Sequence, residues 1–306
     1  MSPLLRGELS AEAVFRENEP LHNKVTLRLG GAARYYAEPA TLDDLKWLLR
    51  EAQRLEVAPF FLGRGSNLLV LDGVLPYLVI RLRHPNWRKL TLLDEMRLQA
   101  GAGVRLRELC GQASKLGLSG FEFLEGIPGT LGGGLRMNAG AMGGSMYQVV
   151  EQVHLLTLDG EEKWLARGEM EVSYRYCKEV ADAVALGAIL RAPGRAERED
   201  IVEKIREFQN QRTSTQPKEA SAGCMFKNPD GDSAGRLIDV LGLKETTCGA
   251  AAVSGVHGNF VINRGGATSA EVIELMQKVR EEVQRRSGIL LEPEVQLLGG
   301  KWEDFL

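Results

Sequence analysis

The order of hydrophobic and polar residues along the chain predicts a protein that mixes helices with strands. Several segments place apolar side chains three and four residues apart, the spacing of one face of a helix. The predicted helices are 41–55, 104–116, 197–209, 233–241 and 268–287. Other segments are short and apolar, or alternate apolar with polar residues, as strands do. The predicted strands are 23–31, 59–62, 68–71, 79–82, 90–99, 149–158, 163–166, 183–190, 260–263 and 289–298.

Several of these segments have clear boundary signals. Thr41 and Thr268 are predicted N-caps, because a Thr side chain accepts a hydrogen bond from the free N–H groups of the first helical turn. Gly288 is predicted to end the last helix. Asp159-Gly160 lies between two strand candidates and is a strong signal for a β-hairpin turn.

The remaining stretches predict how the chain is divided. Residues 1–20 are polar and are predicted to be peripheral. Pro193-Gly194, followed by charged residues, marks a predicted domain boundary. Residues 211–229 are predicted to form a long polar loop, and loops of that length in compact proteins are often functional.

Residues 120–144 are the most unusual stretch of the chain because glycines and apolar residues are interleaved. Its glycines include Gly126, Gly129, Gly132, Gly133, Gly134, Gly140, Gly143 and Gly144. Bare backbone N–H groups close together bind phosphate, and Pro128 would fit the first turn of a helix. We therefore expect a cradle for a pyrophosphate. The alternative is a flexible linker, but linkers are polar and this stretch contains several buried-type side chains such as Phe123 and Leu131.

The cradle differs from the two commonest ones. No Gly-Lys-Ser or Gly-Lys-Thr occurs, so the chain has no P-loop. The dinucleotide fingerprint G-x-G-x-x-G fails as well, because Leu68 and Leu106 stand where the third glycine belongs. Residues 62–67, L-G-R-G-S-N, lie between two strand candidates and predict a second backbone cradle.

Composition and charge narrow the class of protein. The 306 residues carry a net charge of -3 and suggest two or three domains. This balance gives no reason to expect nucleic acid or a membrane surface as partner. No apolar run approaches a membrane span, and the first residues do not resemble a signal peptide. The scattered cysteines form no Cys-x-x-Cys pair and predict no metal site, which points to a cytoplasmic protein with free thiols.

A set of motifs resembles one enzyme family, in the family's order and from about residue 20 to 300. The motifs are N-K-V-T-L-R-L-G-G (23–31), L-G-R-G-S-N-L-L-V (62–70), G-I-P-G-T-L-G-G (126–133), M-N-A-G-A (137–141), Y-R (174–175), S-A-G-C-M-F-K-N-P (221–229), H-G-N-F-V-I-N (257–263) and L-E-P-E-V (291–295). Together they are similar to the MurB family, the UDP-N-acetylenolpyruvoylglucosamine reductases. The short link between residue 190 and the F-K-N-P motif resembles the shorter, type II branch.

The resemblance implies a fold and a domain order. It implies an α+β protein with a two-subdomain FAD-binding region of the vanillyl-alcohol-oxidase (PCMH) type and a C-terminal α/β substrate-binding domain. We expect FAD-binding subdomain 1 at 1–82, subdomain 2 at 83–195 and the substrate-binding domain at 196–306.

The resemblance also implies cofactors and a reaction. Non-covalent FAD would accept hydride from NADPH, and a UDP-sugar, UDP-N-acetylglucosamine enolpyruvate, would be reduced for peptidoglycan precursor synthesis. No obligate protein partner is implied. The residues matched to FAD are Leu62, Gly63, Gly65, Ser66, Asn67, Gly126, Ile127, Gly129, Thr130, Gly133 and Asn138.

Three residues match the family's catalytic positions. Arg175 would stabilise the negative charge on the substrate, because a guanidinium stays protonated and binds carboxylates. Cys224 matches the proton donor, which in the family is commonly Ser. Glu294 matches a second acid beside the intermediate, and Glu292 is left open as a supporting residue.

The substrate contacts are less specific. Tyr174, Lys227 and Asn228 match residues that hold the sugar nucleotide, although packing or solvated-loop roles are the alternatives. His257 could contact flavin or substrate, but a lone His is more often structural. The alternative functions are another flavin-dependent oxidase or dehydrogenase of the same fold, and a sugar-nucleotide binder without catalysis.

Overall fold

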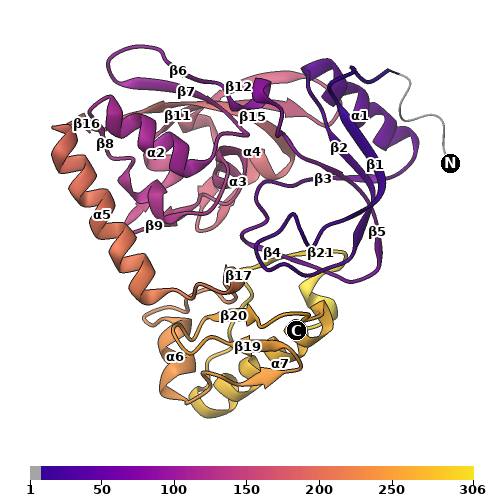
Figure 1. Cartoon of the computed structure of the whole chain (residues 1–306), viewed down its shortest axis with the longest axis vertical. Coiled ribbons are helices and arrows are strands. Elements are labelled where there is room, and N and C mark those ends of the chain that lie inside the picture. The colour runs from indigo at the N-terminus through magenta and orange to yellow at the C-terminus, as the bar shows by residue number, and fades with distance from the viewer. Residues whose placement is uncertain (1–7) are drawn as a thin grey trace. The chain divides into compact units, whose positions relative to one another are not determined.

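The computed structural model describes residues 8–306, which divide into two compact units (Figure 1). The first unit contains the residues up to Glu17, then Tyr35–Arg64 and Tyr77–Arg212. The second contains Asn18–Arg34, Gly65–Pro76 and Thr213–Leu306. The boundaries predicted at residues 82 and 195 divide the chain differently, into three consecutive segments, and stay a prediction.

The first unit contains most of the secondary structure. Its strands, three of which continue into the second unit, are β1 (Val14–Pro20), β2 (Ala32–Glu38), β3 (Ala58–Phe61), β5 (Val74–Ile80), β6 (Leu90–Leu92), β7 (Arg97–Gly101), β8 (Leu118–Ser119), β9 (Gly140–Ala141), β10 (Gly144–Ser145), β11 (Val150–Thr157), β12 (Glu162–Ala166), β13 (Val172–Ser173), β14 (Tyr176–Cys177), β15 (Ala183–Arg191) and β16 (Gly194–Arg195). Its helices are α1 (Leu42–Arg54), α2 (Leu106–Lys115), α3 (Leu131–Arg136), α4 (Lys178–Ala181) and α5 (Arg198–Thr215), with 3₁₀ turns η2 (Pro85–Arg88), η3 (Glu122–Gly126), η4 (Met146–Gln148) and η5 (Arg167–Glu169).

A five-stranded antiparallel sheet, in the order β12-β11-β15-β7-β6, organises the first unit. Strand β15, A-V-A-L-G-A-I-L-R, is buried on both faces, which explains its nearly continuous apolar sequence. One face packs with α2, η3 and α3, and the other, through Val184 and Leu186, packs with α1. Parts of the glycine-rich stretch, η3 and α3, are therefore packed against this sheet. A second sheet has the order β1-β2-β5-β3.

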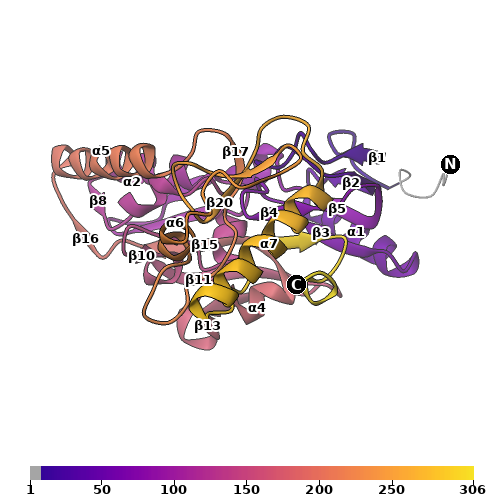
Figure 2. The same ribbon diagram turned by 90° about the horizontal axis from the view of Figure 1, so that it is seen from below.

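The second unit is a smaller α+β layer. Its remaining elements are β4 (Leu68–Val70), β17 (Ala220–Cys224), α6 (Ala234–Val240), β18 (Thr247–Cys248), β19 (Ala251–Val253), β20 (Phe260–Asn263), α7 (Ser269–Ser287), β21 (Gln296–Leu298) and η6 (Trp302–Asp304). Strands β17-β20-β19-β18 form an antiparallel sheet, and β21 pairs in parallel with β4. Helix α7, seen clearly in Figure 2, packs its apolar stripe against this layer.

Elements with local boundary signals are confirmed. Thr41 and Thr268 each form a capping box, with Asp44 and Glu271 respectively. Gly288 ends α7 in the left-handed conformation, with φ 75°. The Asp159-Gly160 turn joins β11 to β12 in an antiparallel hairpin.

Two predicted strands are wrong over most of their length because side-chain burial did not come from strand pairing. Residues 23–31 form successive turns, such as Lys24 N–H to Leu21 O at 2.8 Å, and their alternating leucines are buried within the second unit's core. Residues 289–298 pair regularly only from Gln296 onward. Pro293, which has no N–H to donate, lies in the segment before that strand.

Other predictions need correction. Residues 90–99 contain two antiparallel strands, β6 and the start of β7, and not one. The supposed loop 211–229 contains the end of α5 and strand β17, whose small residues give little strand signal. The predicted peripheral N-terminal segment forms β1, a mostly exposed strand at the edge of its sheet, which agrees with a peripheral position, and its residues 1–7 lie outside the described part. Pro128 precedes the N-cap Thr130 and so lies outside α3.

Within residues 8–306, no helix is both long enough and apolar enough to cross a membrane. The same residues contain no group of three His, Cys, Asp or Glu side chains arranged to hold a metal ion.

Close backbone packing in the second unit leaves no room for a side chain at Gly31. A Cβ on Gly31 would lie 1.8 Å from the carbonyl oxygen of Gly73, so Gly31→Ala should destabilise the protein by about 1–3 kcal/mol. Gly111→Ala is the control, because a Cβ there meets nothing within 4 Å and Ala favours the helix by about 0.5–1 kcal/mol. Thermal unfolding should therefore show a lower Tm for the first variant and an equal or higher Tm for the second. Equal Tm values for Gly31→Ala and the wild type would contradict the packing argument.

Candidate active site

The glycine loop after η3 is attached to the turn that precedes α2. Leu106 N–H donates to Gly129 O at 3.1 Å, and Leu131 N–H donates to Val104 O at 2.8 Å. Gly132 N–H donates to Ala102 O, and a Cβ on Gly132 would lie 3.2 Å from Ala102 Cβ. Gly132 is thus a packing glycine, and the loop is fixed on one side by backbone hydrogen bonds.

Two glycines of the same loop have no such packing reason. A Cβ on Gly126 would come no closer than 3.8 Å to Ala141, and one on Gly133 no closer than 3.7 Å to Thr130. Neither has a positive φ. A methyl group at either position would make only ordinary van der Waals contacts, so neither packing nor a positive φ requires glycine there, and close approach by a cofactor is a reason for a bare backbone.

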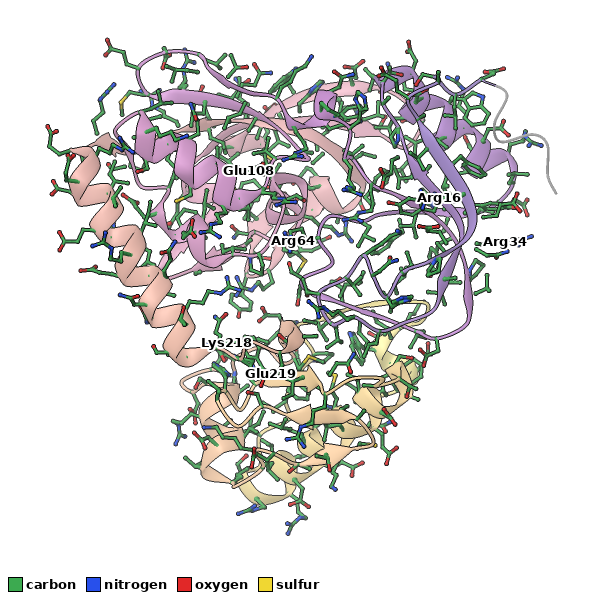
Figure 3. All side chains as sticks on the ribbon, in the orientation of Figure 1. Arg16, Arg34, Arg64, Glu108, Lys218 and Glu219 are labelled. Carbon is green, nitrogen blue, oxygen red and sulfur yellow. The ribbon has the colours of Figure 1, made fainter. Side chains whose placement is uncertain are left out.

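The second predicted cradle approaches the first within the same unit. A Cβ on Gly63 would lie 2.7 Å from Thr130 Oγ1, and Arg81 Nη2 donates to Gly63 O at 3.0 Å. Leu62 is buried beside this glycine, whereas Arg64, labelled in Figure 3, is exposed. Gly63 and Thr130, which were predicted separately, are thus brought together.

Charged residues that the sequence analysis missed support the glycine loop from behind. Glu125 accepts from Gln209 Nε2 at 2.8 Å and lies 2.9 Å from Arg107 Nε. Arg212, on the same helix as Gln209, donates from Nη1 to Gly126 O. Burial lowers the pKa of Arg212, and the charge of Glu125 opposes that shift. The only sequence signal was an acidic residue directly before the first glycine of the loop.

Arg175 lies in a strained turn of the first unit. Tyr174 and Arg175 connect β13 to β14, and Arg175 has φ 58°, which is uncommon for any residue but glycine, Asn or Asp. Strain of this kind is concentrated at functional sites. Its Nη1 lies 3.4 Å from Gly140 O, and its Cζ lies 5.0 Å from the centre of the Tyr174 ring.

Asn138 braces that turn. Its Nδ2 donates to Ser173 O at 3.1 Å, while its Oδ1 accepts from Tyr147 N–H at 3.4 Å. Asn138 itself has φ 38°. The M-N-A-G-A motif therefore holds the Arg175 hairpin, and the cofactor contact predicted for Asn138 stays a prediction.

In the second unit the other end of the 62–67 loop contacts strand β17. Thr26 Oγ1 lies 2.7 Å from Ser221 O and 3.2 Å from Gly65 O. Gly65 has φ 60°, and a Cβ on it would lie 2.6 Å from Val25. Lys218 and Glu219, labelled in Figure 3, directly precede β17.

A bulge in β17 presents Cys224. The register shifts between Ser221 and Cys224, with Gly223 at φ 75°, and Cys224 then pairs with Phe260. A Cβ on Gly223 would lie 3.6 Å from Ser66 O, so the bulge lies beside residues 62–67. We call residues 62–67 the flavin loop, because they match FAD-binding residues of the family. Bulges commonly redirect a side chain next to an active site. Cys224 is half-buried.

Glu294 is hydrogen-bonded between the segment after Cys224 and the flavin loop. Its N–H donates to Met225 O at 2.8 Å, and its own carbonyl accepts from Asn67 Nδ2 at 3.2 Å. Gln296 N–H completes the link by donating to Asn67 O at 3.1 Å. Glu294 is only 8% exposed. Asn67 and Glu294 are therefore joined by a hydrogen bond, and Glu294 is bonded to Met225, the residue that follows Cys224.

Three further candidates already have partners. Lys227 Nζ lies 3.0 Å from Glu292 Oε2, in an exposed ion pair. Asn228 Oδ1 accepts from Ala234 N–H at 3.1 Å, at the start of α6. His257 Nδ1 accepts from Asn259 N–H at 3.1 Å, and burial lowers the pKa of this imidazole. These contacts favour a structural role for His257.

The buried thiols of the first unit are poor candidates for chemistry. Burial, followed by the charges of Glu125 and Glu122, raises the pKa of Cys110 to about 12. Burial also raises the pKa of Cys177. Both thiols stay protonated at neutral pH, and Cys110 is a core residue as expected.

Known proteins resemble the chain over nearly its whole length. A family model described as UDP-N-acetylenolpyruvoylglucosamine reductase, C-terminal domain, matches residues 216–298, and an FAD binding domain model matches residues 33–166. The chain is 40% identical over 303 residues to UDP-N-acetylenolpyruvoylglucosamine reductase 2 of Symbiobacterium thermophilum, covering 98% of each. The chain belongs to this reductase family, MurB. The Bacillus subtilis reductase is 36% identical, covering 92% of this chain and 93% of its own.

A solved structure agrees. The crystal structure of MurB from Thermus caldophilus has a TM-score of 0.80 and 36% identity, covering 93% of this chain and 99% of its own. The predicted fold class, the enzyme class of oxidoreductase and the cofactor FAD are thereby confirmed. Gly126 and Gly133, where neither packing nor a positive φ requires glycine, fit close approach by a dinucleotide, and together with Gly63 and Thr130 these residues would hold it.

The lack of a packing requirement at Gly133 predicts a variant that affects the cofactor and not the fold. Gly133→Ala adds a Cβ 3.7 Å from the nearest described protein atom, so the Tm of the apoprotein should stay close to that of the wild type. The methyl group would occupy cofactor space and raise the Kd for FAD about tenfold, which corresponds to about 1.4 kcal/mol. A fluorescence titration of apoprotein with FAD measures this. Gly168→Ala, whose Cβ meets nothing within 4 Å, should change neither quantity, and an unchanged Kd for Gly133→Ala would remove Gly133 from the cradle.

Proposed function

We propose that this protein, whose family functions in peptidoglycan precursor synthesis, reduces UDP-N-acetylglucosamine enolpyruvate to UDP-N-acetylmuramate with NADPH as electron source. Nearly full-length similarity to reductases of that name supports this substrate. The observation that carries the proposal is the arrangement in the second unit, where Cys224 and Glu294 flank the Met225 backbone beside Asn67. We expect the enzyme to be cytoplasmic.

Bound FAD would supply hydride transfer, from NADPH to the terminal carbon of the enolpyruvyl group. That transfer leaves negative charge on the adjacent carbon and its carboxylate. The guanidinium of Arg175 stabilises this charge, because it is always protonated and can donate two parallel hydrogen bonds to a carboxylate. The strained turn and Asn138 hold the backbone from which the guanidinium extends, and its Nη1 lies 3.4 Å from Gly140 O.

Cys224 delivers the proton that completes the reduction. Its S–H bond breaks as a C–H bond forms at the adjacent carbon, and the resulting thiolate takes a proton from solvent. A thiol has a reference pKa of about 8.5 and gives up its proton more readily than a Ser hydroxyl. The bulge at Gly223 positions the thiol for this step.

Glu294 contributes the second acidic group. Its burial keeps water away from the carboxyl, and its backbone bonds to Met225 and from Asn67 fix its place beside Cys224 and the flavin loop. In this role it hydrogen-bonds the developing enol. Glu292 forms its ion pair with Lys227 and so acts through that lysine.

The UDP-sugar is recognised by the matched residues Tyr174, Lys227 and Asn228. Lys227 attracts the diphosphate, and Glu292 sets where its ammonium group lies. Asn228 keeps an amide N–H₂ for the ligand while its oxygen accepts from Ala234 N–H at the start of α6. Tyr174 is 56% exposed, and the centre of its ring lies 5.0 Å from the Cζ of Arg175, the residue assigned to the substrate carboxylate.

An anaerobic absorbance experiment tests the whole assignment. NADPH should bleach the yellow flavin band of the purified protein, and UDP-N-acetylglucosamine enolpyruvate should restore it, because each addition drives one half of the reaction. Bleaching that only oxygen reverses would point to a flavin oxidase of the same fold. A protein that takes up no FAD would contradict catalysis altogether.

Variants of Cys224 test the proton donor. Cys224→Ser keeps a proton on a similar atom and should retain substantial activity. Cys224→Ala should still be reduced by NADPH but lose about 10²–10⁴-fold in reoxidation by the enolpyruvyl substrate, the usual contribution of general acid catalysis. Stopped-flow absorbance separates the two steps. Turnover of the Ala variant at the wild-type rate would exclude Cys224 from the mechanism.

A further inference from the structure

Asn259 is a buried amide with no place in the reaction described above. It is 2% exposed and lies directly before strand β20. Its Oδ1 accepts from Phe226 N–H at 2.9 Å, and its Nδ2 donates to Phe226 O at 2.7 Å. Its own carbonyl accepts from Met225 N–H at 2.9 Å.

These hydrogen bonds extend the β17–β20 pairing beyond Cys224, with the Asn259 side chain in place of a strand backbone. Cys224 pairs with Phe260, and the next residues of the β17 chain meet Asn259. A side-chain amide has the same donor and acceptor as a peptide group, so it can replace a strand partner where the backbone turns away. Asn259 N–H is itself bonded to His257 Nδ1, which fixes that turn.

On the side away from Asn259, Met225 and Phe226 contact the segment that contains Glu294. Met225 O accepts from Glu294 N–H at 2.8 Å, and Phe226 forms a β-bridge with Pro293. Met225 and Phe226 are therefore fixed between Asn259 on one side and the Glu294 segment on the other. Cys224 immediately precedes them, so its distance from Glu294 depends on how firmly these two residues are held.

We propose that Asn259 is a positioning residue for the reduction, acting by fixing the Met225–Phe226 backbone so that the Cys224 thiol stays in register with Glu294. The inference rests on the proposed function and deepens it. The inference concerns only reoxidation of the flavin by the enolpyruvyl substrate, because reduction of the flavin by NADPH needs neither the Cys224 thiol nor the Glu294 carboxyl.

Two variants remove the amide in different ways. Asn259→Ala deletes both bonds to Phe226, whereas Asn259→Asp keeps the volume and the acceptor but loses the donor to Phe226 O. Each should be reduced by NADPH at nearly the wild-type rate. Reoxidation by the enolpyruvyl substrate should slow about 10- to 100-fold, since small misplacements of a catalytic group have effects of that size. If the Ala variant does not bind FAD, the Asp variant provides the measurement.

A double-mutant cycle separates positioning from a general loss of structure. In a Cys224→Ala background the proton donor is already absent, so Asn259→Asp should slow reoxidation no further. Equal slowing in both backgrounds, or unchanged reoxidation in both Asn259 variants, would overturn the inference. Gln277→Ala is the matched control, because it loses an amide bond to Phe305 O at 2.6 Å in the same unit and should leave both half-reactions unchanged.

Reoxidation of the wild-type flavin distinguishes a failure of the proposed function from a failure of the role proposed for Asn259. If the enolpyruvyl substrate fails to reoxidise wild-type flavin, the proposed function fails and this inference with it. If the wild type is reoxidised and the Asn259 variants behave like it, only the inference fails.

Discussion

The hydrogen bond from Glu294 N–H to Met225 O is the constraint on which the second unit's site depends. It joins the last part of the chain to β17, and Asn67 then ties the flavin loop to the same segment. Residues 67, 225, 259 and 294 are far apart in sequence, so chain entropy opposes bringing them together. Burial of apolar side chains offsets this loss of chain entropy. The buried residues include Ala222, Met225, Phe226, Leu291 and Val295.

The first unit solves a related problem with strain. Arg175 has a positive φ, which is unfavourable for a residue with a long side chain unless the surrounding structure holds it there. The bond from Asn138 Nδ2 to Ser173 O, with Tyr147 on the other side of the amide, holds the hairpin against relaxation. In both units an asparagine amide therefore acts on the backbone next to a catalytic candidate, Asn138 beside Arg175 and Asn259 beside Cys224.

The sequence predicted the features whose causes are local. Thr41, Thr268 and Gly288 mark helix ends through hydrogen bonds or backbone angles within a few residues, and Asp159-Gly160 does the same for a hairpin. The alternation at 23–31 misled because loop leucines can be buried without pairing. The motifs identified Cys224 and Glu294, but a side-chain amide substituting for a strand partner leaves no periodic signal, so Asn259 had none.

Glycine shows where sequence reasoning reaches its limit. Gly65 and Gly288 supply a positive φ, while Gly31 and Gly132 permit close packing. Gly126 and Gly133 do neither, because a Cβ at either position would make only an ordinary van der Waals contact. Within the loop matched to FAD this third kind points to a ligand, whereas Gly111 and Gly168, which also lack both reasons, lie outside that loop. All three kinds are the same letter in the sequence, so the density of glycines could suggest a cradle but only the structure separates the residues that build it from those that line it.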